Sequence, residues 1–101
     1  MGTVKRRVLL SPDATRQFCQ VRAADRTLVR DAMKTSLEVG DATEETRNRF
    51  RLRRPSPFAD YELRVEDYRI FYRVVANEVL VAMIGRKRGN FLVVDRRRFI
   101  L

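Results

Sequence analysis

The chain has 101 residues, 45% of them hydrophobic, and its 22 Lys and Arg outnumber 13 Asp and Glu, which gives a net charge of +9. This length closes one modest core, so we expect a single domain over residues 1–101. The absence of histidine excludes Ser-His-Asp triads, histidine-based ribonuclease chemistry and histidine-ligated zinc.

The first half of the chain is predicted to form one strand and then a helical hairpin. Residues 4–10 are short enough for a strand; their basic start leads into the apolar Val8-Leu9-Leu10, which stops at Ser11-Pro12, a typical helix start. Apolar residues then recur at helical spacing, which predicts helices over residues 12–22 and 26–39. Asp25 is expected to cap the second helix, and Gly40 to end it in a left-handed conformation.

One face of this helical hairpin is expected to pack on a sheet. Its apolar stripe consists of Phe18, Val29, Met33 and Leu37. Cys19, the only cysteine, is expected to be a small buried side chain, and without a second cysteine a disulfide framework is excluded.

Arginines follow the helices at alternate positions. Residues 41–46 are a connector or a single helical turn, and residues 47–54 carry arginine at every second position, opposite Phe50 and Leu52. If this segment is extended, its arginines line one face as a basic stripe, which Pro55 and Pro57 end. The candidate nucleic-acid ligands here are Arg49, Arg51, Arg53 and Arg54.

The second half is predicted to be an antiparallel meander of three to four strands. Residues 61–65 and 68–74 alternate between apolar and polar side chains around a turn at Glu66-Asp67, which predicts a hairpin with one buried face. A turn at Ala76-Asn77 leads into residues 78–84, whose nearly continuous apolar content favours a central strand covered on both faces.

A basic loop and a last hairpin are expected after the meander. Residues 85–90 are bracketed by glycines and are predicted to form a loop that presents Arg86, Lys87 and Arg88. Residues 91–94 and 99–101 have the pattern of a final hairpin. The sequence therefore predicts an α+β fold with an N-terminal strand, a helical hairpin and an antiparallel sheet.

The excess of arginine points to a polyanionic partner. Arginine grips phosphate through paired hydrogen bonds, and nucleic acid or an acidic protein segment would both fit the charge. With four glycines the chain has no phosphate-binding loop or dinucleotide fingerprint, so we expect no cofactor and no metal. No apolar run reaches the length of a signal peptide or membrane span, so we expect a cytoplasmic protein with no membrane partner.

The meander carries two motifs, L-R-x-x-x-Y-R-I-x-Y and I-G-x-K-R. Together with the order of the elements, they resemble the RelE/ParE superfamily of type II toxin-antitoxin toxins, and the likeness covers nearly the whole chain. The residues of these motifs are Leu63, Arg64, Tyr68, Arg69, Ile70, Tyr72, Ile84, Gly85, Lys87 and Arg88.

The resemblance implies a toxin that an acidic antitoxin holds inactive. RelE-like members cut messenger RNA on the ribosome, which would make the ribosome and the messenger further partners. The catalytic residues it implies are Arg69, which follows the strand tyrosine, and Lys87 or Arg88, the basic residues after the glycine. Arginines can stabilise the charge of an attack by a 2′-hydroxyl without histidine. Arg64 and Arg86 are further candidate RNA ligands.

Two departures from the nuclease pattern keep an alternative open. Asp60 and Glu62 stand where nuclease-type members carry lysines, and no tyrosine follows Tyr72. The alternative is a ParE-like toxin that binds DNA gyrase and blocks replication without catalysis, and an inert relative that only pairs with its antitoxin is a third reading.

Overall fold

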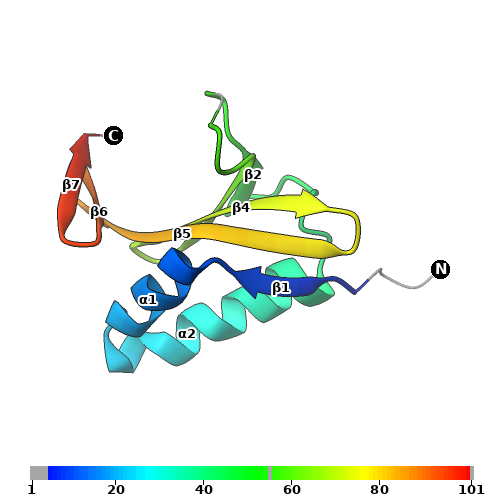
Figure 1. Ribbon diagram of the computed structural model, residues 1–101, viewed down its shortest axis with the longest axis horizontal. Helices are drawn as coiled ribbons and strands as arrows, with labels where there is room; N and C mark the ends of the chain where they lie inside the picture. The colour runs from blue at the N-terminus through cyan, green and yellow to red at the C-terminus, as the bar shows by residue number, and fades with distance from the viewer. Residues whose placement is uncertain (1–4, 55, 101) are drawn as a thin grey trace.

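The computed structural model describes residues 5–54 and 56–100, arranged as one sheet with two helices on one side (Figure 1). The elements in chain order are β1 (Arg7–Leu10), α1 (Pro12–Gln20), α2 (Ala23–Met33), the π-helical extension η1 (Lys34–Val39), β2 (Arg49–Arg51), β3 (Tyr61–Val65), β4 (Tyr68–Val75), β5 (Glu78–Arg88), β6 (Phe91–Val94) and β7 (Arg97–Ile100).

The sheet is antiparallel in the order β2-β3-β4-β5-β6-β7, and β1 is its one parallel strand among the described residues. β5 is central because it is long enough to pair along one edge with both β1, at residues 78–81, and β6, at residues 86–88. The predicted α+β fold with helices on one face of an antiparallel sheet is confirmed. The meander is longer than predicted, since β3 to β7 follow one another without interruption.

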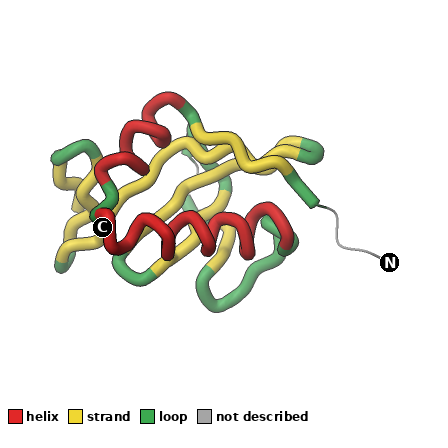
Figure 2. The backbone as a smooth tube through the Cα atoms, turned by 90° about the horizontal axis from the view of Figure 1, so that it is seen from below, coloured by secondary structure: helices red, strands yellow, loops and turns green. Residues whose placement is uncertain are grey.

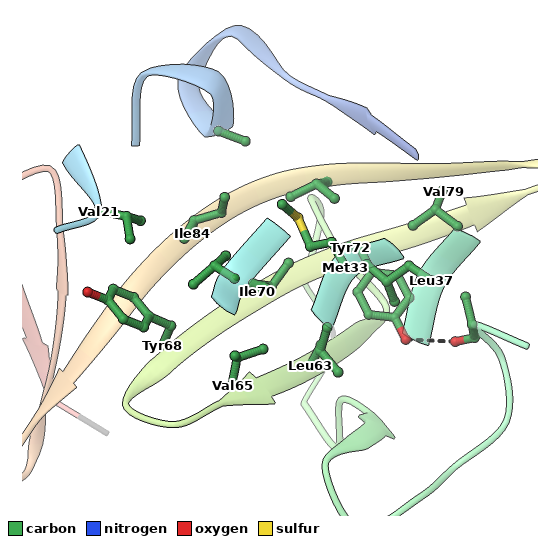
Figure 3. Packing of buried hydrophobic residues seen from close by; sticks show 14 residues of the cluster. Val21, Met33, Leu37, Leu63, Val65, Tyr68, Ile70, Tyr72, Val79 and Ile84 are labelled. Atoms are coloured by element: carbon green, nitrogen blue, oxygen red, sulfur yellow. Dashed lines mark hydrogen bonds between the residues drawn. The ribbon is translucent and has the colours of Figure 1, made fainter. Parts of the chain in front are cut away.

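α1 and α2 cross the strands on the same side of the sheet (Figure 2). The apolar stripe of the helices faces this side, because Val29, Met33 and Leu37 are buried against the strands while Phe18 is partly buried. Figure 3 shows Met33 and Leu37 next to Ile70 and Tyr72 of β4. The other face of the sheet, which we call the open face, carries no helix formed by residues 5–54 or 56–100. No helix within the described residues is long and apolar enough to cross a membrane.

The predicted N-cap of α1 is confirmed, and the predicted N-cap of α2 is wrong. Ser11 caps α1 as predicted, since its Oγ accepts a 3.0 Å hydrogen bond from the backbone N–H of Ala14. Asp25 does not cap α2, because the helix begins after Arg22; its carboxylate instead accepts a 2.8 Å hydrogen bond from the hydroxyl of Tyr68.

Two further expectations about the helices are wrong. Cys19 is exposed, because it lies on the outer side of α1. Gly40 follows η1 with a φ of −77°, so no left-handed residue is needed there. A Cβ at Gly40 would lie 2.9 Å from the carbonyl oxygen of Thr35, so close packing is what requires glycine at this position.

Candidate nucleic-acid interface

Strand pairing brings two arginines together on the open face. Arg64 of β3 stands directly opposite Arg69 of β4, and Arg69 stands opposite Gly85 of β5. Ile70 and Ile84, the next pair along, are buried beneath the helices. Because side chains alternate between the faces of a strand, Arg64 and Arg69 both belong to the open face.

A carboxylate lies between these two arginines. Glu62 accepts a 2.8 Å hydrogen bond from Nε of Arg64 through Oε2, and the same oxygen lies 3.8 Å from Nε of Arg69. The side chains of Glu62 and Arg69 are only 12% and 11% exposed, whereas that of Arg64 is 49% exposed. The cluster therefore has a net positive charge, and one of its two arginines, Arg64, is exposed to solvent.

Arg69 is held in place by backbone oxygens. Its Nη1 donates hydrogen bonds to the carbonyls of Glu66, at 2.8 Å, and Tyr68, at 3.0 Å. Burial lowers the pKa of Arg69, and the neighbouring charge of Arg64 lowers it further. Arginine starts from so high a pKa that this side chain remains a cation at neutral pH. Arg69 is thus a fixed positive charge in the open face.

Apolar side chains flank Glu62 in a row that crosses four strands. Phe50, Glu62, Phe71 and Met83 are successive partners across β2, β3, β4 and β5. The guanidinium of Arg64 lies over the ring of Phe50, 4.7 Å from its centroid. Aromatic rings next to arginines are the combination on which unpaired bases stack while their phosphates are neutralised.

The basic segment after Gly85 is not a loop, contrary to the sequence prediction. Residues 86–88 continue β5 and pair with β6, and only residues 89–90 form the turn. The alternation of the strand then separates the three basic residues. Lys87 belongs to the open face with Gly85, whereas Arg86 and Arg88 belong to the helix side. Arg69 and Lys87 therefore share a face that Arg88 does not.

Arg49 is not part of an exposed stripe, which corrects the sequence expectation. Its side chain is buried, and the residue is 7% exposed. Its Nε donates a 2.7 Å hydrogen bond to the carbonyl of Glu44, and its Nη1 a 2.6 Å bond to that of Ser36. Ser36 lies in η1, whose last carbonyls lack helical partners, so Arg49 closes the end of that helix.

The remaining arginines of this segment are exposed. β2 ends at Arg51, whose guanidinium lies 5.6 Å from the centroid of the Tyr61 ring. Arg53 and Arg54 follow in a bend and are open to solvent. The predicted stripe therefore loses Arg49 and keeps four exposed arginines in and beside β2, which are Arg47, Arg51, Arg53 and Arg54; Pro55 lies outside the described residues.

Glu62 is the site residue that the sequence analysis did not assign. In the sequence, Glu62 counts only as a departure from the nuclease pattern. The pattern Glu62-x-Arg64 within an alternating strand does place both on one face, and the two-residue turn after Val65 sets Arg69 opposite Arg64. The signal for the cluster was therefore present in the hairpin register.

Comparison with known protein families and curated proteins identifies no similar protein. No family model matches the chain, and a search of curated proteins returns no significant match. The resemblance to RelE/ParE toxins accordingly rests on the residues quoted for it.

Proposed function

We propose that the chain is a toxin of the RelE/ParE type that binds single-stranded RNA on its open face and cleaves it. The observation that carries this proposal is the cluster in which Arg64 and Arg69 flank the carboxylate of Glu62. It combines a group able to accept a proton with two cations able to stabilise a phosphate, in a protein that has no histidine.

Binding follows from the row of side chains across the open face. A base stacks on Phe50 or Phe71, and the adjoining phosphate meets the exposed guanidinium of Arg64. Arg69 donates through the N–H groups that it does not use for the carbonyls of Glu66 and Tyr68. The two arginines outweigh the single carboxylate, so Glu62 does not prevent phosphate from binding.

The chemistry is an internal transfer within RNA. Glu62 accepts the proton of the 2′-hydroxyl, and the 2′-oxygen attacks the adjacent phosphorus. Arg69 and Arg64 stabilise the negative charge that develops on the phosphoryl oxygens. The bond from phosphorus to the 5′-oxygen then breaks, which yields a 2′,3′-cyclic phosphate and a 5′-hydroxyl once the leaving oxygen is protonated.

Lys87 is the candidate donor of that last proton. It belongs to the open face, and its backbone N–H donates a 2.6 Å hydrogen bond to the carbonyl of Asp67, in the turn between β3 and β4. This fixes the backbone of Lys87 beside the hairpin that carries Arg64 and Arg69. An ammonium here can both attract the phosphate and protonate the leaving oxygen.

The proposed partners are those of a type II toxin: an acidic antitoxin segment and the translating ribosome with its messenger. An acidic segment lying across the open face would neutralise the cluster and exclude RNA from it. Cleavage on the ribosome belongs to the same proposal and needs no cofactor in this scheme.

The test is to add the purified chain to a translating cell-free system and to map new messenger 5′ ends. Glu62→Gln keeps the shape of the side chain and an oxygen acceptor for Arg64 but cannot take a proton. We expect it to lower the cleavage rate by about 10²- to 10⁴-fold, the usual contribution of a general base. RNA binding is expected to persist, because a negative charge is lost.

The matched control is Arg73→Gln. Arg73 lies on β4, on the same face as Arg69, and pairs with Asp60 at 3.3 Å. Cleavage by this variant is expected to equal that of the wild type, whereas Arg69→Gln is expected to be inactive and folded. Intact messages in the presence of the wild-type chain would exclude the nuclease, and inhibited DNA supercoiling in the same preparation would favour the gyrase-binding alternative.

A further inference from the structure

A second basic site lies on the other side of the sheet, where α1 ends and α2 begins above β5. It is a hollow of about 370 Å³, which we call the arginine hollow. Ligand pockets of small molecules typically begin at about 300 Å³, so this volume is sufficient for a mononucleotide. Its walls include Gln17, Gln20, Arg22, Tyr68, Arg86, Arg88, Val93, Asp95 and Arg96.

The charge of the arginine hollow is strongly positive. Within the described part of the chain, four arginines and one carboxylate, that of Asp95, line it. Among the described residues, none of the four forms an ion pair. The charge of Asp95 is already neutralised by Arg16, which does not line the hollow and pairs with it at 2.8 Å; Asp95 also accepts a 2.9 Å hydrogen bond from Gln17. The hollow therefore presents unpaired guanidinium groups to any anion that enters.

Arg86 is held in a fixed orientation at the wall of this hollow. Its guanidinium lies 5.4 Å from the centroid of the Tyr68 ring, and the hydroxyl of Tyr68 is in turn bonded to Asp25. The Nε of Arg86 is buried and has no hydrogen-bond acceptor within the described part of the chain. The ring of Tyr68 therefore holds the guanidinium of Arg86 at the wall of the hollow.

The turn between β6 and β7 places Arg96 at the same hollow in a strained conformation. Asp95 and Arg96 both have positive φ, of 51° and 66°. A two-residue hairpin turn of this kind normally uses Asn and Gly. Here the bonds from Arg16 and Gln17 to the carboxylate of Asp95 hold the turn against α1. Strained backbone that its surroundings fix in this way is common where a side chain must be aimed at a ligand.

We propose that the arginine hollow binds a phosphate monoester, either that of a free mononucleotide or the terminal phosphate of an RNA strand. Arginines bind such a group through paired, charge-assisted hydrogen bonds, and Arg22, Arg86, Arg88 and Arg96 bring four guanidinium groups to one hollow. The site lies on the face opposite Glu62 and Arg69, so it does not depend on RNA cleavage by the open face.

The experiment is calorimetric titration of the whole chain with adenosine 5′-monophosphate and with adenosine. We expect binding of the phosphorylated probe and none of adenosine. Arg88→Gln, at an exposed position of the hollow, is expected to weaken binding about tenfold, the effect of one lost charge-assisted contact. The control with the same charge change is Arg47→Gln. Arg47 is exposed and lies next to β2, at the far edge of the sheet. We expect this variant to bind adenosine 5′-monophosphate with the affinity of the wild type.

Two results would overturn the proposal: equal binding of both probes, or equal loss of affinity in the Arg88 and Arg47 variants. A short RNA strand with and without a 5′-phosphate identifies the source of the group. Tighter binding of the phosphorylated strand than of the mononucleotide assigns the site to a strand end, and the reverse order assigns it to free mononucleotides. Because neither arm measures cleavage, failure here leaves the proposed nuclease untouched.

Discussion

Tyr72 is a fully buried phenol whose hydroxyl donates a 2.7 Å hydrogen bond to the carbonyl of Ala42, drawn as the dashed line in Figure 3. Phenylalanine would fill the same space and leave that carbonyl without this donor. We expect Tyr72→Phe to lower the free energy of unfolding by about 1–3 kcal/mol, the cost of an unsatisfied buried group. Urea denaturation of the two proteins measures this difference.

Tyr61 provides the control for that variant. Its ring stacks on Tyr72 with centroids 5.3 Å apart, but it is partly exposed, and its hydroxyl accepts only a 3.4 Å hydrogen bond from Arg51. Tyr61→Phe is expected to change the free energy of unfolding by less than about 0.5 kcal/mol, as surface changes usually do. Equal losses in the two variants would show that the bond to Ala42 is not the cause.

Arg49 shows where reasoning from residue type fails. Arg49, Arg51 and Arg53 repeat at one spacing and are identical in sequence terms, yet only the first is buried. Its side chain is held by two backbone carbonyls, that of Glu44, five residues earlier, and that of Ser36 in η1. Alternation fixes the face of a strand residue, and the distant partners decide whether that residue meets solvent.

At the scale of elements, Gly85 decides how β5 joins β6. A Cβ built at Gly85 would lie 2.7 Å from Cγ2 of Val94 and 3.0 Å from Cδ1 of Leu92. Glycine is therefore required for the close approach of two strands, whereas the sequence reading took it as the start of a loop. The same residue type serves both purposes, so the sequence alone does not separate them.

This close approach predicts the effect of Gly85→Ala. The added methyl group must push β6 away from β5, and overpacking of this kind costs about 1–3 kcal/mol of unfolding free energy. We expect amide hydrogen exchange to accelerate in β6 and β7 and to remain slow at the pairing of β3 with β4. Uniform acceleration over the whole sheet would contradict a local effect of the Cβ.

At the scale of the whole molecule, the sequence predicts contacts between consecutive elements better than contacts between elements that are far apart in the sequence. The helical pair and the hairpin of β3 and β4 follow from hydrophobic spacing and from a two-residue turn, and both are confirmed. The parallel pairing of β1 with β5 joins segments about seventy residues apart and has no local pattern. The placement of Lys87 and Arg88 on opposite faces of the sheet has no local pattern either. It depends on the pairing of residues 86–88 with β6, which continues β5 to Arg88.

The net charge of +9 makes the proposed RNA binding depend on salt. Each phosphate of a single strand that the protein neutralises adds about −0.7 to the slope of log affinity against log salt concentration. Arg64 is the exposed cation of the open-face cluster, so Arg64→Gln is expected to make that slope shallower by about 0.7. Fluorescence anisotropy of a labelled RNA strand over a series of salt concentrations measures both slopes.

The control for this measurement is an arginine of the helix side. Arg30 is exposed on α2 and lies over the ring of Phe18, 5.7 Å from its centroid, away from the open face. Arg30→Gln removes the same charge from the molecule, and its slope is expected to match the wild type. If both variants reduce the slope equally, the RNA responds to overall charge and the open face is not its binding site, since a located contact must distinguish two arginines on opposite sides of one sheet.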